Sequence, residues 1–198
     1  MDKRLTSRQQ QAEETKARLI DSALKVFSAK GFSASTTKDI AREAGVTDGL
    51  ISHYFKSKQD LIGAILDRHT LVHPIRGMIS GLRDDMGLEE MVSDYVHALF
   101  RLLEQNNDLI VMIFGEAQRE PEIRARLAAI VSEGAKPLAA ILARKENRDE
   151  AEMTHAVRNL QFAVVQYYLI FYRTHFDAED RERYLRETAR QFVSIVKR

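Results

Sequence analysis

The chain has 198 residues, enough for one large domain or two modest ones with a hydrophobic core. Its 44% hydrophobic and 30% charged residues, with only three prolines and nine glycines, are typical of a soluble globular protein built from long helices. The absence of cysteine excludes a disulfide framework, a thiolate metal site and a cysteine nucleophile. The start lacks the apolar core of a signal peptide and no apolar run is long enough to cross a bilayer, so we expect a cytoplasmic protein without a membrane partner.

The net charge of +1 hides an uneven distribution. Residues 1–60 carry 11 Lys or Arg against 8 Asp or Glu, whereas the remainder carries 19 against 21. A mildly basic N-terminal part suits a phosphate-binding surface, although the bias alone does not identify one.

The first predicted elements are a polar arm and a long helix. Residues 1–12 are polar and expected to be flexible, and Lys3, Arg4 and Arg8 could either follow a DNA groove or stay in solvent. From about Glu13 to Lys30 the apolar residues recur on one side of a helix, which Gly31 ends.

Residues 36–55 predict two short helices joined by a tight turn. Thr36 is expected to cap the first helix together with Asp39, and Gly45 to supply the positive φ of its C-cap. Thr47 is expected to cap the second helix. Small residues where two helices must approach closely, at this spacing, are the helix-turn-helix pattern.

This stretch resembles the TetR-type (TetR/AcrR family) transcriptional regulators. The resemblance covers about residues 14–66 and is carried by Thr36-Thr37, Ile40-Ala41, Ala44-Gly45-Val46 and His53-Tyr54-Phe55-Lys56-Ser57-Lys58 with Leu61. It implies an all-α fold of about nine helices, with an N-terminal three-helix DNA-binding domain followed by a helical effector-binding and dimerisation domain. The expected boundaries are a flexible arm at 1–12, the DNA-binding domain at 13–60 and the C-terminal domain at 61–198.

Helix starts in this motif provide the expected DNA contacts. Backbone N–H groups at a helix N-terminus hold phosphates, and the N-terminal end of the recognition helix reads bases. Family resemblance adds that Tyr54 and Lys58 match phosphate-holding positions and that Lys38 lies near a base edge. The predicted DNA-binding residues are Thr36, Thr37, Lys38, Thr47, Asp48, Gly49, Leu50, Ser52, His53, Tyr54 and Lys58.

Two positions depart from the family pattern. Many members carry Thr or Ser where this chain has Leu50, and an aromatic residue where it has Ser52. Leu50 offers only apolar contact, such as to a thymine methyl group, so the family's base preferences cannot be transferred. The string Ile51 to Phe55 is similar to that of choline-responsive members, which says little about the effector itself.

The later helices follow from capping and periodicity. Ser57 and Asp60 form a second capping box, opening a helix expected to end near His73-Pro74. The apolar run Leu109–Phe114 is expected to be buried on all sides. Besides an uncertain segment at 74–85, the further predicted helices are 88–105, 108–118, 121–145, 149–175 and 180–197.

The C-terminal region is expected to hold a dimer interface and an effector pocket. Its last two helices carry more apolar surface than one contact face can cover, and TetR-type regulators dimerise through these helices. Interface candidates are Tyr167, Phe171, Phe192 and Val196, some of which could be core instead. A small, largely apolar effector would suit the pocket candidates His97, Phe100, Phe114, Gln118, Gln161 and Tyr168, although each could also be core.

The sequence therefore predicts a DNA-binding transcriptional regulator, a homodimeric repressor that a small molecule releases from a palindromic operator. No cofactor is expected, and the His69–His73 pair lacks a third ligand for a metal. Enzyme motifs for nucleotide binding, serine hydrolysis or zinc peptidase activity are absent from the sequence. A helical protein that binds DNA and dimerises without any effector is the alternative.

Overall fold

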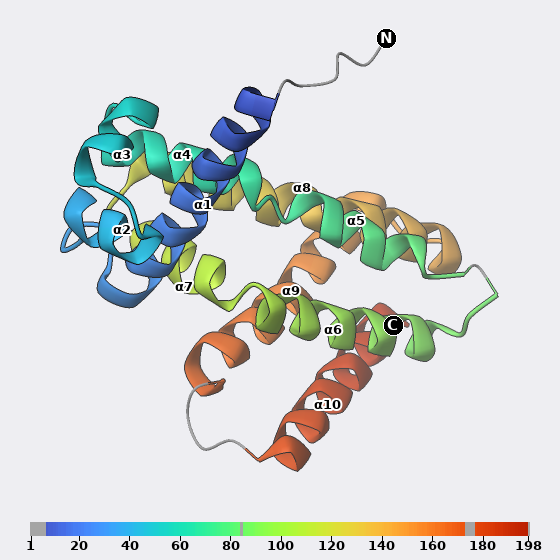
Figure 1. The fold of residues 1–198 in the computed structure, drawn as a ribbon. Helices are drawn as coiled ribbons and strands as arrows, with labels where there is room; N and C mark the ends of the chain where they lie inside the picture. Colours follow the sequence, from blue (N-terminus) through green and yellow to red (C-terminus); the bar gives the residue numbers. More distant parts are fainter. Residues whose placement is uncertain (1–6, 84, 173–176, 198) are drawn as a thin grey trace, which may run out of the picture. The chain divides into compact units, whose positions relative to one another are not determined.

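The computed structural model describes residues 7–83, 85–172 and 177–197, which form ten α-helices and no strand (Figure 1). The all-α fold class is thus confirmed, with ten helices against about nine expected. Lys3 and Arg4 of the predicted arm, and His175 at the predicted end of a helix, lie outside the described residues. The chain divides into two compact units: residues up to Thr70 with Asp108–Arg124, and Leu71–Asn107 with Ala125 onward.

The first unit contains the predicted three-helix motif. Here α1 packs against α2 and α4, and α2 packs against α3. Its helices are α1 (Ser7–Lys30), α2 (Thr37–Ala44), α3 (Asp48–Tyr54) and α4 (Lys58–Arg68). Residues 7–12, expected to be a flexible arm, are the helical start of α1, because the sequence SRQQQA is rich in good helix formers even though it buries no apolar face.

The fourth helix, α4, ends earlier than the position of Pro74 predicted. We expected one helix from Ser57 to about His73-Pro74, but α4 ends at Arg68 and α5 (Val72–Ser80) contains Pro74. Proline is tolerated in the first turn of a helix, where its missing N–H has no intrahelical acceptor to satisfy. Pro74 therefore lies near a helix start and not at a helix end.

A segment from the second half of the sequence completes the first unit. This segment is Asp108–Arg124, which includes all but the first residue of α7 (Asn107–Glu116) and the first turn of α8 (Pro121–Glu146). The apolar run at 109–114 is not buried on all sides as expected: Val111 and Phe114 are only half-buried. A helix surface wraps through all directions, so six consecutive apolar residues necessarily reach more than one face.

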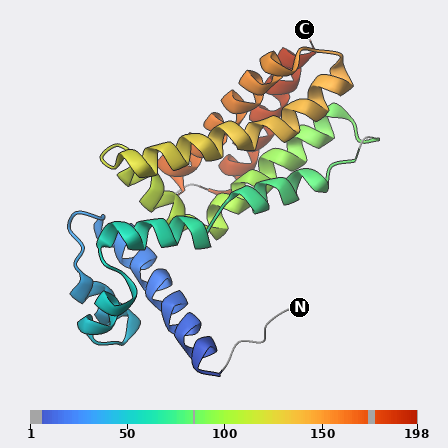
Figure 2. The same ribbon diagram turned by 90° about the horizontal axis from the view of Figure 1, so that it is seen from above.

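The second unit is a helical bundle centred on α6 (Leu88–Gln105). This helix, whose bounds agree with the prediction, packs against α5, α9 (Glu150–Phe171) and α10 (Ala178–Val196), and α9 packs against α10 (Figure 2). Its apolar stripe is fully buried from Met91 to Leu103 at helical spacing. None of the helices placed by the structure combines the length and apolar content needed to cross a bilayer.

Candidate DNA-binding surface and effector pocket

The start of α2 is held by a complete capping box. The Thr36 hydroxyl accepts from the Asp39 amide at 3.1 Å, and the Asp39 carboxylate accepts from the Thr36 amide at 3.1 Å. The same carboxylate accepts from Lys30 Nζ and from Arg42 Nη2, each at 2.7 Å. The hydrogen bond from Lys30, followed by those from Thr36, holds the pKa of Asp39 well below its ordinary value. Asp39 is thus ionised and keeps the positive end of α2 rigid.

In the turn between α2 and α3, the predicted C-cap at Gly45 is present, but the predicted side-chain cap at Thr47 is not. Gly45 has φ +66° and ends α2, and the Val46 amide donates to the Ala41 carbonyl at 2.9 Å. Thr47 does occupy the N-cap position of α3, but its side chain makes no capping hydrogen bond, contrary to the prediction. Thr47 is exposed.

The predicted DNA-binding residues lie on the surface of one compact unit. Thr36, Lys38, Thr47, Gly49, Ser52 and His53 are exposed, whereas Thr37, Asp48, Leu50, Tyr54 and Lys58 are half-buried. Ile51 and Phe55 are buried, as expected for the core face of the recognition helix. The His53 and Tyr54 rings meet edge to face with centroids 5.1 Å apart. The motif therefore presents a polar face supported by an apolar one.

Lys58 has a role that its position in the sequence did not reveal. Its Nζ donates to the carbonyls of Phe32 and Ser35, both at 2.7 Å, and lies 4.5 Å from the Phe32 ring centroid. Two of its three N–H groups thus hold the loop between α1 and α2. Its expected phosphate contact remains a prediction, with fewer donors available for it.

Four of the six effector-pocket candidates belong to the second compact unit. Phe100, Gln161 and Tyr168 are buried in the second unit, where Gln161 donates to the Tyr95 hydroxyl at 2.6 Å. His97 is half-buried at the α6–α10 contact, bonding Ser93 O at 2.7 Å and Glu182 at 3.1 Å. Phe114 and Gln118 belong to the first compact unit, and the pocket of all six residues stays a prediction. Periodicity did not reveal that this segment packs with the N-terminal helices.

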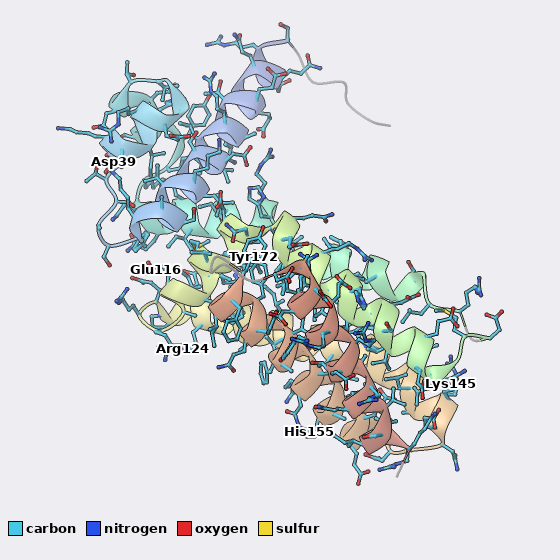
Figure 3. The ribbon with its side chains drawn as sticks, turned by 90° about the horizontal axis from the view of Figure 1, so that it is seen from below. Asp39, Glu116, Arg124, Lys145, His155 and Tyr172 are labelled. Atoms are coloured by element: carbon cyan, nitrogen blue, oxygen red, sulfur yellow. The ribbon has the colours of Figure 1, made fainter. Side chains whose placement is uncertain are left out.

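An aromatic cavity of about 80 Å³ does lie in the second unit. Its lining comes from α6, α9 with its C-cap Tyr172, and α10: Phe100, Tyr167, Phe171, Tyr172 and Arg181 (Tyr172 is labelled in Figure 3). The Arg181 guanidinium lies 5.6 Å from the Phe100 centroid and meets Glu104 and Glu182 at 3.5 Å each. Those distances exceed the 2.7–2.9 Å or so of strong charge-assisted hydrogen bonds, so the guanidinium is only loosely held.

The dimer candidates are mostly core within the protomer. Tyr167, Phe192 and Val196 are buried within the chain itself, and Phe171 is half-buried. An open groove of about 230 Å³ runs between α9 and α10, with Leu160, Phe192 and Ile195 among its lining residues. The exposed large apolar side chains are Phe162, Leu169, Ile170, Tyr172 and Ile195. The interface on α9 and α10 stays a prediction, and which face of these helices is available for it depends on how they pack within the chain.

Asp21 on α1 contacts the end of α4. One of its partners there is His69, a member of the His69–His73 pair considered above. Its carboxylate accepts from Arg68 Nε at 3.0 Å and lies 2.9 Å from His69 Nε2. Burial opposes its ionisation, but the hydrogen bonds and charges of Arg68 and His69 outweigh burial and leave the Asp21 pKa below its ordinary value. Within the described part of the chain, no group of three His, Asp or Glu side chains is placed to hold a metal ion.

Comparison with known proteins agrees with this geometry. A family model described as "Bacterial regulatory proteins, tetR family" matches residues 19–65. The HTH-type transcriptional regulator UidR of Escherichia coli (strain K12) is 29% identical over 121 residues, which is 60% of each chain. BetI of Agrobacterium fabrum is 35% identical over 125 residues, or 58% of this chain and 56% of BetI. The matches thus span less than two thirds of the length of these relatives.

Solved structures share the fold over nearly the whole chain. A transcriptional regulator from Rhodococcus sp. Rha1 aligns with a TM-score of 0.72 and 18% identity, covering 92% of this chain and 97% of that one. A Saccharomonospora viridis regulator in complex with choline aligns with a TM-score of 0.70 and 17% identity, covering 92% and 96%. These likenesses show a shared fold, and the matched family model adds the helix-turn-helix segment of bacterial regulatory proteins. The helix-turn-helix segment at residues 19–65 is that of the TetR family of bacterial regulatory proteins.

Proposed function

We propose that this protein is a sequence-specific DNA-binding transcriptional regulator, a homodimeric repressor that a small molecule releases from a palindromic operator. The observation that carries the proposal is the exposed polar face of α2 and α3 on a rigidly capped unit. Such a face matches the way a helix-turn-helix motif enters a major groove. Relatives named as HTH-type transcriptional regulators support the same function.

Within that proposal the contacts divide by chemistry. Thr37 and Lys38 open α2 and would hold a phosphate, while Ser52 and His53 on α3 present hydrogen-bonding groups toward base edges. Leu50 is half-buried and would contribute apolar contact only. Two copies of α3 about 34–36 Å apart would read the two halves of a palindrome.

The effector is proposed to enter the cavity lined by Phe100, Tyr172 and Arg181. Its aromatic walls suit an aromatic or alkyl body, and its loosely paired guanidinium suits a carboxylate. The structural neighbour that binds choline makes a quaternary ammonium the alternative, since such cations bind aromatic faces. Binding would act by favouring a dimer whose recognition helices no longer match successive grooves.

The first experiment is selection of bound DNA from random duplexes across a salt series. We expect the native protein to enrich a palindrome. Lys38→Ala should weaken binding to every sequence and reduce the salt slope by about 1, because one phosphate contact is lost. Tyr54→Phe should weaken binding without changing that slope. Lys58 is a poor choice for this test because its removal would also loosen the α1–α2 loop.

The control is Lys145→Ala, which removes the same charge from the last turn of α8 in the second compact unit (Lys145 is labelled in Figure 3). It should leave both the enriched sequence and the salt slope unchanged. If the native protein enriches no sequence and binds weakly at every salt concentration, the regulator proposal fails.

The effector proposal is tested on the enriched duplex with benzoate and choline as probes. Release by benzoate that is lost in Arg181→Met would support a carboxylate effector. Release by choline that survives in Arg181→Met would replace it with a cation. If neither probe nor a wider set of small acids and amines alters DNA affinity, the protein is an effector-free DNA-binding dimer.

A further inference from the structure

A buried glutamate links α7 to the DNA-binding motif. Glu116, the last residue of α7, is 3% exposed, and its Oε1 accepts from the Phe32 amide at 2.8 Å (Figure 3). Phe32 lies in the loop between α1 and α2, 84 residues earlier in the sequence. The second carboxylate oxygen, Oε2, is buried and has no hydrogen-bond partner among the residues that the structure describes.

The loop that Glu116 contacts is held from two sides. While Glu116 accepts from the Phe32 N–H, Lys58 donates to the Phe32 carbonyl, so both polar groups of this residue are bound by side chains of other helices. Gly31 has φ +79°, and a Cβ on it would lie 3.3 Å from Glu116 Oε1. Four residues beyond Phe32, Thr36 begins the capping box of α2. The position of this loop therefore sets where α2 starts.

The position of Glu116 is itself braced. Arg124 in the first turns of α8 donates from Nε to the Ala117 carbonyl at 2.8 Å and from Nη2 to the Gln118 carbonyl at 2.7 Å. These bonds close the turn that follows α7, so the residue before it has little freedom. Figure 3 labels both Glu116 and Arg124.

Stability alone does not explain such a residue. A buried carboxylate with one oxygen unpaired costs free energy, and a well-packed apolar side chain would avoid that cost. A hydrogen-bond acceptor at this point does, however, determine where one particular peptide group lies. That contrast favours a positional role over a stabilising one.

We propose that Glu116 is a positioning residue for DNA binding, which holds the Phe32 amide so that the α1–α2 loop presents Thr36, Thr37 and Lys38 in register with α3. This inference rests on the proposed function. Glu116 acts through its reach and its acceptor oxygen, and its charge is not required.

Four variants separate these properties. Glu116→Gln keeps the reach and an acceptor oxygen but removes the charge, Glu116→Asp keeps the charge but loses the reach, and Glu116→Ala loses both. Ile113→Val is the matched control, since it trims a buried side chain of the same helix without touching the hydrogen bond. Each is assayed for affinity toward the enriched palindrome and toward random duplex, for hydrogen exchange of the Phe32 amide by NMR, and for Tm.

We expect Glu116→Gln to keep slow Phe32 exchange and an affinity for the palindrome within about twofold of the native value. Glu116→Ala and Glu116→Asp should speed Phe32 exchange and weaken palindrome binding by about tenfold, while random-duplex affinity stays within about twofold because no phosphate contact is removed. Ile113→Val should lower Tm without speeding Phe32 exchange selectively or reducing the preference for the palindrome.

Several outcomes would overturn the proposal. It fails if Glu116→Asp keeps the preference for the palindrome over random duplex and Glu116→Gln loses it, because the charge of the side chain would then matter. It also fails if Ile113→Val loses as much preference for the palindrome as Glu116→Ala does. A third contradicting outcome is hydrogen exchange of the Phe32 amide that is unchanged in both Glu116→Asp and Glu116→Ala. If Glu116→Ala does not fold, the comparison of Glu116→Gln with Glu116→Asp is sufficient to test the proposal. If the native protein enriches no duplex, the proposed function fails, and unchanged Phe32 exchange in Asp would overturn the Glu116 contact separately.

Discussion

At the scale of single residues, Tyr95 and Gln161 place a polar pair inside the apolar second unit. Both side chains are buried, and the Gln161 amide donates to the Tyr95 hydroxyl at 2.6 Å. Burial raises the pKa of Tyr95 to about 12, against a smaller lowering by the Gln161 hydrogen bond. The pair joins α6 to α9 at one defined register, because any sliding of the two helices would leave both groups unpaired.

Removing this hydroxyl tests that account. Tyr95→Phe should lower the free energy of unfolding by about 1–3 kcal/mol, because the buried Gln161 amide loses its acceptor. The measurement is urea unfolding at pH 7. Tyr54→Phe, on the partly exposed recognition helix, serves as the control and should change unfolding little. An unchanged unfolding curve for Tyr95→Phe would mean that the pair contributes nothing net.

The same tyrosine predicts an alkaline limit of stability. Its folded-state pKa lies above the ordinary value of 10, so its contribution is fully present below pH 10 and is lost as the pH rises toward about 12. Burial also raises the pKa of Tyr167, so titration of the tyrosinate absorbance should show one late-ionising tyrosine fewer in Tyr95→Phe than in the native protein. If the number of late-ionising tyrosines is the same in both, Tyr95 is not one of them.

At the scale of helices, the features determined by local sequence were predicted correctly, whereas those determined by tertiary packing were missed. The α2 capping box, the Gly45 C-cap and the bounds of α6 were confirmed because a few neighbouring side chains determine them. The break between α4 and α5, and the packing of α7 with the first unit, were missed because no local signal encodes them.

The site shows the same division. The exposed face of α2 and α3 follows from motif and periodicity, whereas the structural bonds of Lys58 and the Phe32–Glu116 contact join residues 26 and 84 positions apart. Likewise, Tyr167, Phe192 and Val196 were recognisable as apolar, but which face of α9 or α10 each one occupies depends on the bundle.

Two glycines in the first unit should respond in opposite directions to the same change. Gly63→Ala lies inside α4 with nothing within 4 Å of the new Cβ, so it should stabilise by about 0.5–1 kcal/mol. Gly45→Ala must keep φ +66°, so it should destabilise by about 1–2 kcal/mol. Thermal unfolding of both variants beside the native protein measures the contrast. Equal shifts of the same sign would contradict the assignment of these backbone conformations.

At the scale of the whole molecule, apolar exposure is concentrated on two helices and the residue after one of them. The large apolar side chains of the described residues that remain exposed lie on α9, at its C-cap Tyr172, and on α10, with Phe162 47%, Ile170 51% and Ile195 61% exposed. Patches of this kind mark interaction sites in most soluble proteins, and a twofold axis would bring each such face against its own copy. We therefore revise the proposed interface to Phe162, Leu169, Ile170 and Ile195, beside the groove between α9 and α10.

Introducing a charge on this face should separate the protomers while leaving each one folded. Ile195→Asp adds a carboxylate where the side chain is already 61% exposed, so helicity and Tm should change little, but sedimentation equilibrium should shift from dimer to monomer. Gln11→Asp, at an exposed position on α1 in the first compact unit, adds the same charge and should remain dimeric. Because a dimer binds its second half-site at millimolar effective concentration, the monomer should lose roughly 10²–10⁴-fold in affinity for the palindrome. Its affinity for a single half-site should stay unchanged, since the surfaces of α2 and α3 are untouched.

Two outcomes would contradict this account. An Ile195→Asp variant that remains dimeric and binds the palindrome normally would place the interface elsewhere. A native protein that is monomeric at all concentrations would remove the dimer from the proposed mechanism.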